Sequence, residues 1–369
     1  MLKIQSVSSR RRVVAIALGT VMMAIALSAC QGNNSTTSDD SPKPSVNSGS
    51  AATPTSLYGA GATFPVFLYL KWFDEYNRQH PDAQISYQPI GSAAGIQQFL
   101  SGTVDFGASE VPLTDAELAQ IGRGAVLIPS VAGSIAVVYN LPGVESGLQL
   151  SREVLPGIFL GQITRWNDAA IANLNPDIDL PDLPITVIHR SDGSGTTAAF
   201  TAHLSAISPD WQNTVGTGLS VAWPTGTGIK DNAGISAQVQ QGEGVIGYVE
   251  YAFAKQLDLS TAALENQAGE FLLPTADATA QAIATINLSD TLQGAVADPE
   301  VAGAYPIVTY SWLLAYQQYD DPKKAAILQD VLQWGLTEGQ AFGPELGYVP
   351  LPETVVEKAI ATLNQIGAE

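Results

Sequence analysis

The sequence predicts an α/β fold in which mainly parallel strands are flanked by helices. Short apolar, β-branched segments alternate along the chain with longer segments that carry helix-capping signals. This alternation is typical of parallel sheets that are covered by helices on both faces. The chain has one cysteine in 369 residues, which excludes a disulfide scaffold.

The first predicted elements follow one another at short intervals. A proline in the first turn favours the first helix, and Ser92 is the predicted cap of the second. In order, these elements are a strand at Leu57–Tyr58, a helix at Pro65–His80, a strand at Gln84–Gln88, a helix at Ser92–Leu100 and a strand at Val104–Ser109.

A capping box predicts the start of the next helix. Thr114 has the side chain of a helix cap, and Glu117, three residues later, completes the box. Two separate extended segments are expected after it, because both are apolar and β-branched. They are Val126–Pro129 and Ser134–Asn140.

The rest of the chain continues the alternation, and no internal repeat is visible. The predicted strands are Ile185–His189, Val245–Glu250 and Tyr305–Leu314. The predicted helices run from Ser194 to about Leu204, over Lys323–Trp334 and over Glu353–Leu363.

The N-terminus has the pattern of a bacterial lipoprotein signal peptide, which we assign to residues 1–29. Basic residues precede an apolar run at Val13–Leu27, and small residues follow it. The ending Leu27-Ser28-Ala29-Cys30 resembles a lipobox, which implies cleavage before Cys30 and lipid attachment to its sulfur. The alternatives are a transmembrane anchor, which needs roughly 20 apolar residues, or a free buried cysteine.

Residues 30–56 are predicted to form a disordered tether. Ser, Thr, Asn, Pro and Gly dominate there, without an apolar period, so the segment cannot bury enough surface to offset chain entropy. Removal of residues 1–29 leaves 12 basic and 35 acidic residues, a net charge of −23. This charge excludes a basic surface for nucleic acid.

Three short runs have the composition of an anion-binding site. They are Gly59–Pro65, Gly91–Gly95 and Arg190–Thr196. Each places glycine and hydroxyl residues before a helical segment, where free N–H groups and the helix dipole favour negative charge. Only the third run has a guanidinium, and no run contains a catalytic base. We therefore expect capture of an anion without chemistry on it.

Motifs of catalysis and of cofactor binding do not support another function. Gly242–Gly247 matches G-x-G-x-x-G but leads into a strand, which is the reverse of the order in dinucleotide-binding sites. The sequence has no P-loop and no G-x-S-x-G motif. His80, His189 and His203 lack metal-ligand spacing. We predict no catalytic residue, no metal and no cofactor.

From Leu57 to the C-terminus, the chain resembles the periplasmic phosphate-binding lipoproteins of Pst-type ABC importers. The matching motifs are the three runs with Ile90, Thr103–Ser109 and Ile246–Tyr251. The resemblance implies a type II-like periplasmic binding protein with two α/β lobes and a ligand cleft between them. On that pattern the first lobe comprises residues 57–139 and 305–369, and the second comprises residues 140–304.

The resemblance also implies which residues contact phosphate, four from each lobe. The first lobe would supply Thr63, Phe64 (through its backbone N–H), Ser92 and Glu110. The second would supply Arg190, Ser194, Gly195 (through its backbone N–H) and Thr196. Asp192 matches the residue that holds the arginine in place. The ion would then favour the closed arrangement because both lobes bind it.

Glu110 departs from the family pattern, which has Asp at this position. A carboxylate among donors suits phosphate because phosphate near neutral pH still carries an O–H that Glu110 can accept. Sulfate has no such proton, so its oxygen would face the carboxylate. The extra methylene places the carboxylate about 1.5 Å further out, which makes tightness and discrimination against arsenate less predictable than phosphate binding itself.

The resulting hypothesis is a monomeric receptor, lipid-anchored outside the cytoplasmic membrane, that delivers phosphate to ABC permease subunits. Three alternatives remain open at this point. They are a secreted phosphate-recognising hydrolase, a receptor for another tetrahedral oxyanion such as sulfate, and an adhesion module with a vestigial or sensory anion site.

Overall fold

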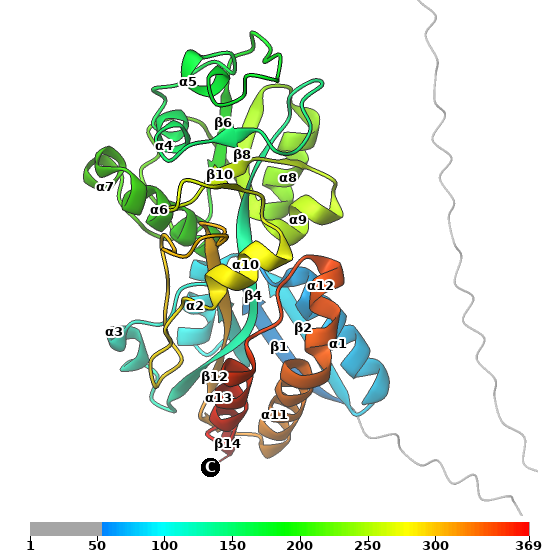
Figure 1. Ribbon diagram of the computed structural model, residues 1–369. Coiled ribbons are helices and arrows are strands. Elements are labelled where there is room, and N and C mark those ends of the chain that lie inside the picture. Colours follow the sequence, from blue (N-terminus) through cyan, green and yellow to red (C-terminus); the bar gives the residue numbers. More distant parts are fainter. Residues whose placement is uncertain (1–53, 369) are drawn as a thin grey trace, which may run out of the picture. The chain divides into compact units, whose positions relative to one another are not determined.

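The computed structural model describes residues 54–368, and the structural statements below concern that part of the chain. The predicted signal peptide, Cys30 and nearly all of the predicted tether lie outside the described residues. The central feature is a nine-stranded sheet with the strand order β2-β1-β3-β12-β4-β8-β6-β7 and β9 paired to β4 (Figure 1).

The sheet has two halves that share one long strand, β4 (Ala125–Tyr139). The first half contains β1 (Thr55–Gly61), β2 (Ala83–Pro89), β3 (Phe106–Ser109) and β12 (Val308–Tyr316). The second half contains β6 (Thr186–Arg190), β7 (Thr227–Ile229), β8 (Val245–Glu250) and the short β9 (Ser260–Thr261).

Strand pairing is parallel among β1, β2 and β3 and among β6, β7 and β8, and it is antiparallel for the pairs that involve β4 or β12. β1 pairs in parallel with β2 and β3, and β6 pairs in parallel with β7 and β8. β12 runs antiparallel to β3 and β4, and β4 runs antiparallel to β8. The predicted α/β fold is confirmed. Its antiparallel pairs involve β4 and β12, the two strands at the centre of the sheet. The lobe limits at residues 139 and 304 stay a prediction.

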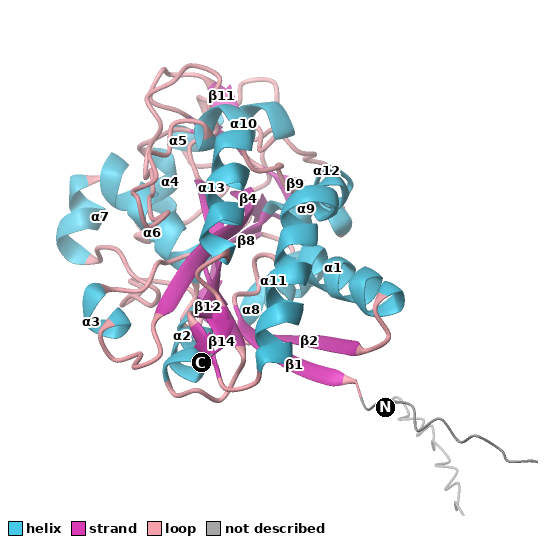
Figure 2. Ribbon diagram, turned by 90° about the horizontal axis from the view of Figure 1, so that it is seen from below, coloured by secondary structure: helices cyan, strands magenta, loops and turns pink. Residues whose placement is uncertain are grey.

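Helices pack on the faces of both halves (Figures 1 and 2). Those associated with the first half are α1 (Val66–Gln79), α2 (Ser92–Leu100), α3 (Asp115–Leu118), α11 (Pro322–Thr337), the 3₁₀ helix η1 (Glu338–Phe342), α12 (Gly343–Leu346) and α13 (Glu353–Leu363). The others are α4 (Val154–Phe159), α5 (Ala169–Ala172), α6 (Gly195–Ile207), α7 (Pro209–Thr214), α8 (Asp231–Gln241), α9 (Tyr251–Gln256) and α10 (Ala276–Ile283).

Two small sheets complete the described fold. One has the order β11-β10-β5, and the other pairs β13 with β14. Their strands are β5 (Gln149–Leu150), β10 (Ala263–Glu265), β11 (Phe271–Leu272), β13 (Gln318–Tyr319) and β14 (Gly367–Ala368).

The prediction of two separate extended segments between residues 126 and 140 is wrong, because β4 is one continuous strand of 15 residues. The interruption read from the sequence is a register shift: Ser311 pairs with Val131 and Trp312 pairs with Pro129. Ser130 is therefore an extra residue in β4, as in a β-bulge. Its hydroxyl donates to the Ser311 carbonyl at 2.9 Å, so the irregular position remains hydrogen-bonded.

Two other boundaries differ from the sequence prediction. β1 begins at Thr55, because residues 55 and 56, which were counted with the tether, pair with Ala83 and Gln84 of β2. β12 begins at Val308 instead of Tyr305. Tyr305 is nevertheless buried, and its hydroxyl donates to the Ile135 carbonyl at 3.0 Å. The capping box at Thr114 and Glu117 is confirmed.

Among the described helices, none is long and apolar enough to cross a bilayer. Their apolar residues instead pack onto the sheet in a large core cluster that includes four fully buried tryptophans. They are Trp72, Trp166, Trp211 and Trp312.

Gly95 allows α2 to lie against β1, and this contact provides a stability prediction. A Cβ at Gly95 would lie 2.3 Å from the Gly61 Cα and 2.9 Å from the Ala60 carbonyl oxygen. Both are backbone atoms, so Gly95→Ala should lower the free energy of unfolding by about 1–3 kcal/mol, despite alanine's better helix propensity.

Urea unfolding measures this change, with Gly122→Ala as the control because a Cβ at Gly122 meets no atom within 4 Å. Equal or greater stability of Gly95→Ala would contradict the tight contact.

Candidate functional site

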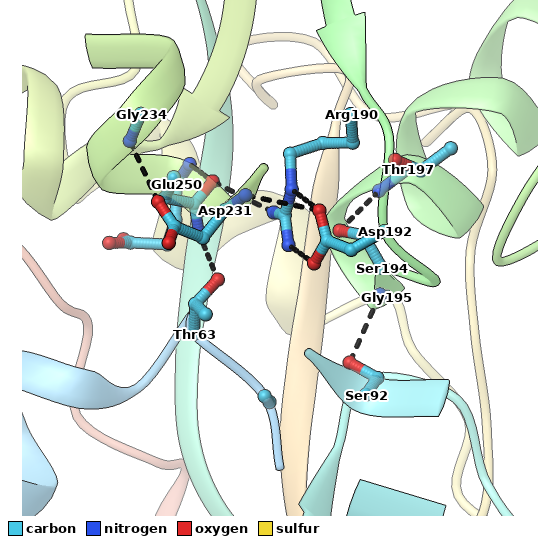
Figure 3. Close-up of polar contacts among 12 residues, drawn as sticks. Thr63, Ser92, Arg190, Asp192, Ser194, Gly195, Thr197, Asp231, Gly234 and Glu250 are labelled. Carbon is cyan, nitrogen blue, oxygen red and sulfur yellow. Dashed lines mark hydrogen bonds and ion pairs between the residues drawn. The ribbon is translucent and has the colours of Figure 1, made fainter. Parts of the chain in front are cut away.

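The three glycine-rich runs meet at the carboxyl ends of parallel strands. Gly59–Gly61 ends β1, and Gly91–Gly95 leads from β2 into α2. Arg190–Thr196 leads from β6 into α6. In open α/β sheets this is the edge where ligands bind. Figure 3 shows Ser92 below Gly195, with Arg190 and Asp192 beside them.

Direct backbone contacts join the second and third runs. The Ala93 N–H donates to the Gly193 carbonyl at 3.0 Å, and the Gly195 N–H donates to Ser92 Oγ at 3.0 Å. The approach is close enough to require glycine. A Cβ at Gly195 would lie 2.3 Å from Glu110 Oε2, and one at Gly193 would lie 2.3 Å from the Ala93 Cβ.

Glu110 is buried directly after β3 and accepts hydrogen bonds from both sides. Ser92 Oγ donates to Glu110 Oε2 at 2.8 Å, and Ser311 Oγ of β12 donates to Oε1 at 2.9 Å. The side chain is only 6% exposed, so it does not point into solvent. The extra methylene relative to Asp is accommodated inside the site.

Burial controls the ionisation of Glu110. Loss of solvation raises its pKa from 4.5 to about 7, although the hydrogen bonds from Ser92 and Ser311 and the charge of Arg190 favour the ionised form. Near neutral pH, the carboxyl can therefore exist in both protonation states.

Arg190 is the buried cation of the site, and Asp192 fixes its orientation. Arg190 Nε donates to Asp192 Oδ1 at 2.7 Å, and Nη2 donates to Oδ2 at 2.5 Å, which makes a bidentate pair. Burial opposes the ionised form of Asp192, but the bonds and charge of Arg190 hold the pKa of Asp192 below its usual range. The predicted partnership of these two residues is present in the structure.

The N-terminus of α6 supplies the remaining predicted residues of the third run. Ser194 caps the helix, because its Oγ accepts from the Thr197 N–H at 3.2 Å. Thr196 is 1% exposed, and its hydroxyl has no hydrogen-bond partner among the described residues. A buried hydroxyl without a partner is costly, and at a helix N-terminus it is available to an anion.

Thr63 and Phe64 lie in the first run, just before α1, and both are buried. Thr63 Oγ1 accepts from Asn232 Nδ2 of α8 at 2.9 Å. The Phe64 carbonyl accepts from the Tyr348 hydroxyl at 2.7 Å. The first run is thus attached to α8 on one side and to the loop after α12 on the other.

The predicted role of Ser92 as a helix cap is wrong. Gly91 is the cap residue, with a φ of 95° that favours glycine, and Ser92 is the first residue of α2. The Ser92 hydroxyl bonds Glu110 and Gly195 instead of the α2 backbone. The sequence does not distinguish a serine that caps a helix from a serine that is the first residue of the helix.

The histidines and the G-x-G-x-x-G match lie outside this group. His189 stacks on Trp223, and His203 is buried with Nδ1 2.9 Å from the Ala297 carbonyl oxygen. Gly244, with a φ of 78°, forms the turn into β8. In residues 54–368 no group of three or more His, Cys, Asp or Glu side chains could hold a metal ion.

Four residues that support the site were missed by sequence analysis. They are Asn232, Glu250, Ser311 and Tyr248, whose hydroxyl accepts from the Arg190 N–H at 3.2 Å. Ser311 is a polar residue within an apolar strand and could have been noticed for that reason. Glu250 lies in the motif Ile246–Tyr251 and caps α9 by accepting from the Ala252 N–H at 2.9 Å. No signal in the sequence points to Asn232.

Comparisons with known proteins identify related sequences. Residues 47–338 match the PBP superfamily domain. The phosphate-binding protein PstS of Pasteurella multocida is 42% identical over 306 residues, covering 82% of this chain and 88% of that protein. The phosphate-binding protein PstS of Xylella fastidiosa is 39% identical over 346 residues, covering 91% and 93%.

A solved structure shows the same fold. It is the high-affinity periplasmic phosphate-binding protein PfluDING, determined with phosphate bound. The TM-score is 0.69 at 21% identity, and the match covers 83% of this chain and 93% of that chain.

The pKa of Glu110 predicts a pH effect on the stability of the phosphate-free protein. Between pH 4.5 and about 7, the folded state holds a proton on Glu110 that the unfolded state has lost. Stability from this group is therefore greatest below pH 4.5 and falls as the pH rises, by at most about 3 kcal/mol. Glu110→Gln should remove this part of the decline.

Urea unfolding at several pH values measures how the free energy of unfolding changes with pH in wild type and in the variant. Glu345→Gln serves as the control because Glu345 is exposed. Glu250, whose pKa burial raises and the charge of Glu110 raises further, titrates in both proteins, so the difference between wild type and variant reports Glu110 together with its coupling to Glu250. An identical decline in wild type and Glu110→Gln would contradict the prediction.

Proposed function

Because this chain belongs to the PstS family of phosphate-binding proteins, within the PBP superfamily, we propose that it binds inorganic phosphate and delivers it to an ABC-type importer. The two halves of the sheet would close on the dehydrated ion. No step in this role requires a nucleophile or a metal, so the protein acts as a receptor and not as an enzyme.

The observation that carries the proposal is a buried group of donors from both halves of the sheet around one buried acid. Arg190 and the Gly195 N–H come from the second half, whereas Ser92 and Glu110 come from the first. Phosphate needs many donors for its oxygens and one acceptor for its proton. This composition fits that need.

Each residue then has a specific task. Arg190 neutralises charge with a guanidinium that Asp192 holds in place. The other proposed donors are the hydroxyls of Thr63, Ser92, Ser194 and Thr196 and the backbone N–H groups of Phe64 and Gly195. To bind the ion, Ser92 and Gly195 would give up the bonds that they donate to Glu110 and to Ser92. The unpartnered hydroxyl of Thr196 supports its assignment as a direct donor. Glu110 accepts the proton of the ion.

Glu110 also provides discrimination between oxyanions. An ionised carboxylate accepts from the O–H of phosphate, but it repels the oxygen of sulfate, which carries no proton. The same carboxyl has a pKa of about 7, so rejection of sulfate weakens at acidic pH, where a protonated Glu110 can donate. This argument favours phosphate over sulfate above pH 7.

The cellular setting follows from the N-terminal pattern. Cleavage before Cys30 and lipid attachment to its sulfur would hold the protein on a bacterial membrane, in the periplasm or otherwise outside the cytoplasm. The predicted tether would let the folded part reach the permease subunits of the importer. A monomer is sufficient for this role.

Calorimetry on the full chain, purified in detergent and stripped of bound solute, tests the proposed function. We expect one phosphate per chain with a dissociation constant of about 1 µM or lower at pH 8.5. Absence of binding at that level would overturn the proposal. Turnover of a chromogenic phosphate ester, abolished by substitution of a site residue, would instead support the hydrolase alternative.

Glu110→Gln should relax the rejection of sulfate, because an amide can donate as well as accept. At pH 8.5 we expect the difference in binding free energy between phosphate and sulfate to shrink by about 1–3 kcal/mol. The ratio of sulfate to phosphate affinity would then rise roughly 5- to 150-fold. Competition calorimetry on wild type and variant measures the ratio. An unchanged ratio would remove the carboxylate from the selectivity mechanism.

Cys30→Ser should abolish lipid attachment without affecting phosphate binding. Metabolic labelling with a radioactive fatty acid in a bacterial host measures the modification, and cell fractionation shows whether the protein leaves the membrane. Labelling that persists in the variant would contradict the assignment of Cys30.

A further inference from the structure

Asn232 joins three parts of the site through one buried amide. Its side chain is 0% exposed and lies at the start of α8, in the second half of the fold. Asn232 Nδ2 donates to Thr63 Oγ1 at 2.9 Å. On the other end, Asn232 Oδ1 accepts from Arg190 Nη1 at 3.3 Å and from the Glu250 N–H at 3.4 Å.

The orientation of this amide is determined by its partners. A guanidinium and a backbone N–H can only donate, so the atom of Asn232 that faces Arg190 and Glu250 must be the oxygen. The nitrogen therefore faces Thr63. The usual ambiguity between an amide's oxygen and nitrogen does not arise here.

The fixed amide determines the polarity of the Thr63 hydroxyl. Because Asn232 Nδ2 can only donate, Thr63 Oγ1 must accept from it. The single O–H of Thr63 remains available to donate in another direction. A donor is what a phosphate oxygen requires at this position.

We propose that Asn232 is a positioning residue that makes Thr63 a donor to the bound anion through Nδ2 and holds the Arg190 guanidinium through Oδ1. The inference rests on the proposed function and adds a determinant of affinity that does not itself contact the ion. The Asn232–Thr63 bond also links α8 to the first run, from the other half of the fold.

The surroundings of Asn232 are built to hold it. The Asp231 N–H donates to Asp192 Oδ1 at 3.1 Å, and Asp231 Oδ1 accepts from the Gly234 N–H at 2.7 Å. Figure 3 shows Asp231 beside Arg190 and Asp192, with Thr63 below Asp231. The residue that orients the arginine thus also anchors the first turn of α8.

A purely structural role for Asn232 makes a different prediction. If Asn232 only filled space, Asn232→Ala would weaken phosphate binding at least as much as Asn232→Asp, which is nearly isosteric. If Asn232 sets polarity, Asn232→Asp is the more harmful change. The new carboxylate can only accept, so Thr63 would donate to it and turn a lone pair toward the anion. Arg190 favours the ionised form of this carboxylate.

The experiment separates this effect from simple charge repulsion. Phosphate affinity of the full chain is measured by calorimetry at pH 8.5 for Asn232→Asp and Asn232→Ala, each alone and together with Thr63→Val. Repulsion by the new charge acts with or without the Thr63 hydroxyl and cancels in the comparison. The polarity effect requires the hydroxyl. Circular dichroism and urea unfolding show which variants are folded.

We expect the loss of affinity from Asn232→Asp to be roughly tenfold greater with Thr63 present than in the Thr63→Val protein. We also expect Asn232→Ala to be less harmful than Asn232→Asp. Equal losses in the two backgrounds, or a larger loss for Asn232→Ala, would overturn the inference.

If Asn232→Asp does not fold, the comparison of Asn232→Ala with wild type decides. A positioning role predicts a loss that is smaller in the Thr63→Val background, where only the part that acts through Arg190 remains. Equal loss in both backgrounds would overturn the action of Asn232 on Thr63. Wild-type protein that binds no phosphate would overturn the proposed function and this inference together. If wild-type protein binds phosphate but the Asn232 substitutions cost the same affinity with and without the Thr63 hydroxyl, the inference alone would be overturned.

Discussion

The hydrogen bonds that run from the Gly195 amide to Ser92 and on to Glu110 are the interactions on which the rest of the site depends. They lie where two halves of the sheet meet, and every group in them is buried. A buried donor needs an acceptor, and a buried carboxylate needs donors. The glycine at position 195, the serine at the start of α2 and the acid after β3 are therefore mutually required. Replacing Ser92 or Glu110 leaves a neighbour without a hydrogen-bond partner, and a side chain at position 195 would collide with the Glu110 carboxylate.

Sequence reasoning identified the parts of this site that are local in the chain. Gly59–Gly61, Ser92 and Arg190–Thr196 were found because glycine, hydroxyl and strand-to-helix order are visible within a few residues. The α/β fold was predicted for the same reason, since strand and helix periodicities are local patterns. The course of β4 was not, because Pro129 and Gly133 resemble an interruption. Only its pairing with β12 shows that a bulge at Ser130 absorbs the irregularity.

The residues that support the site could not be predicted, because they act over long sequence distances. Ser311 reaches Glu110 from 201 residues away, and Asn232 reaches Thr63 from 169 residues away. Neither lies in a glycine-rich run, and each looks like an ordinary polar residue of its own element. Their function comes from the strand order, which brings β12 beside β3, and from the packing of α8 on β6 and β8, which leaves Asn232 within hydrogen-bond distance of Thr63. Resemblance to a family extends to its binding motifs more readily than to these remote partners.

The continuity of β4 has a mechanical consequence. Ser134 is the last residue of β4 that pairs with β12, and Ile135 is the first that pairs with β8. Between these two residues the strand exchanges one ladder for another. The Ile135 N–H still donates to the Ile307 carbonyl at 2.9 Å, so one backbone hydrogen bond spans the change. The peptide between Ser134 and Ile135 is therefore where the backbone passes from one ladder to the other. Any rotation of one ladder against the other would act on this peptide and on the Ile135–Ile307 bond.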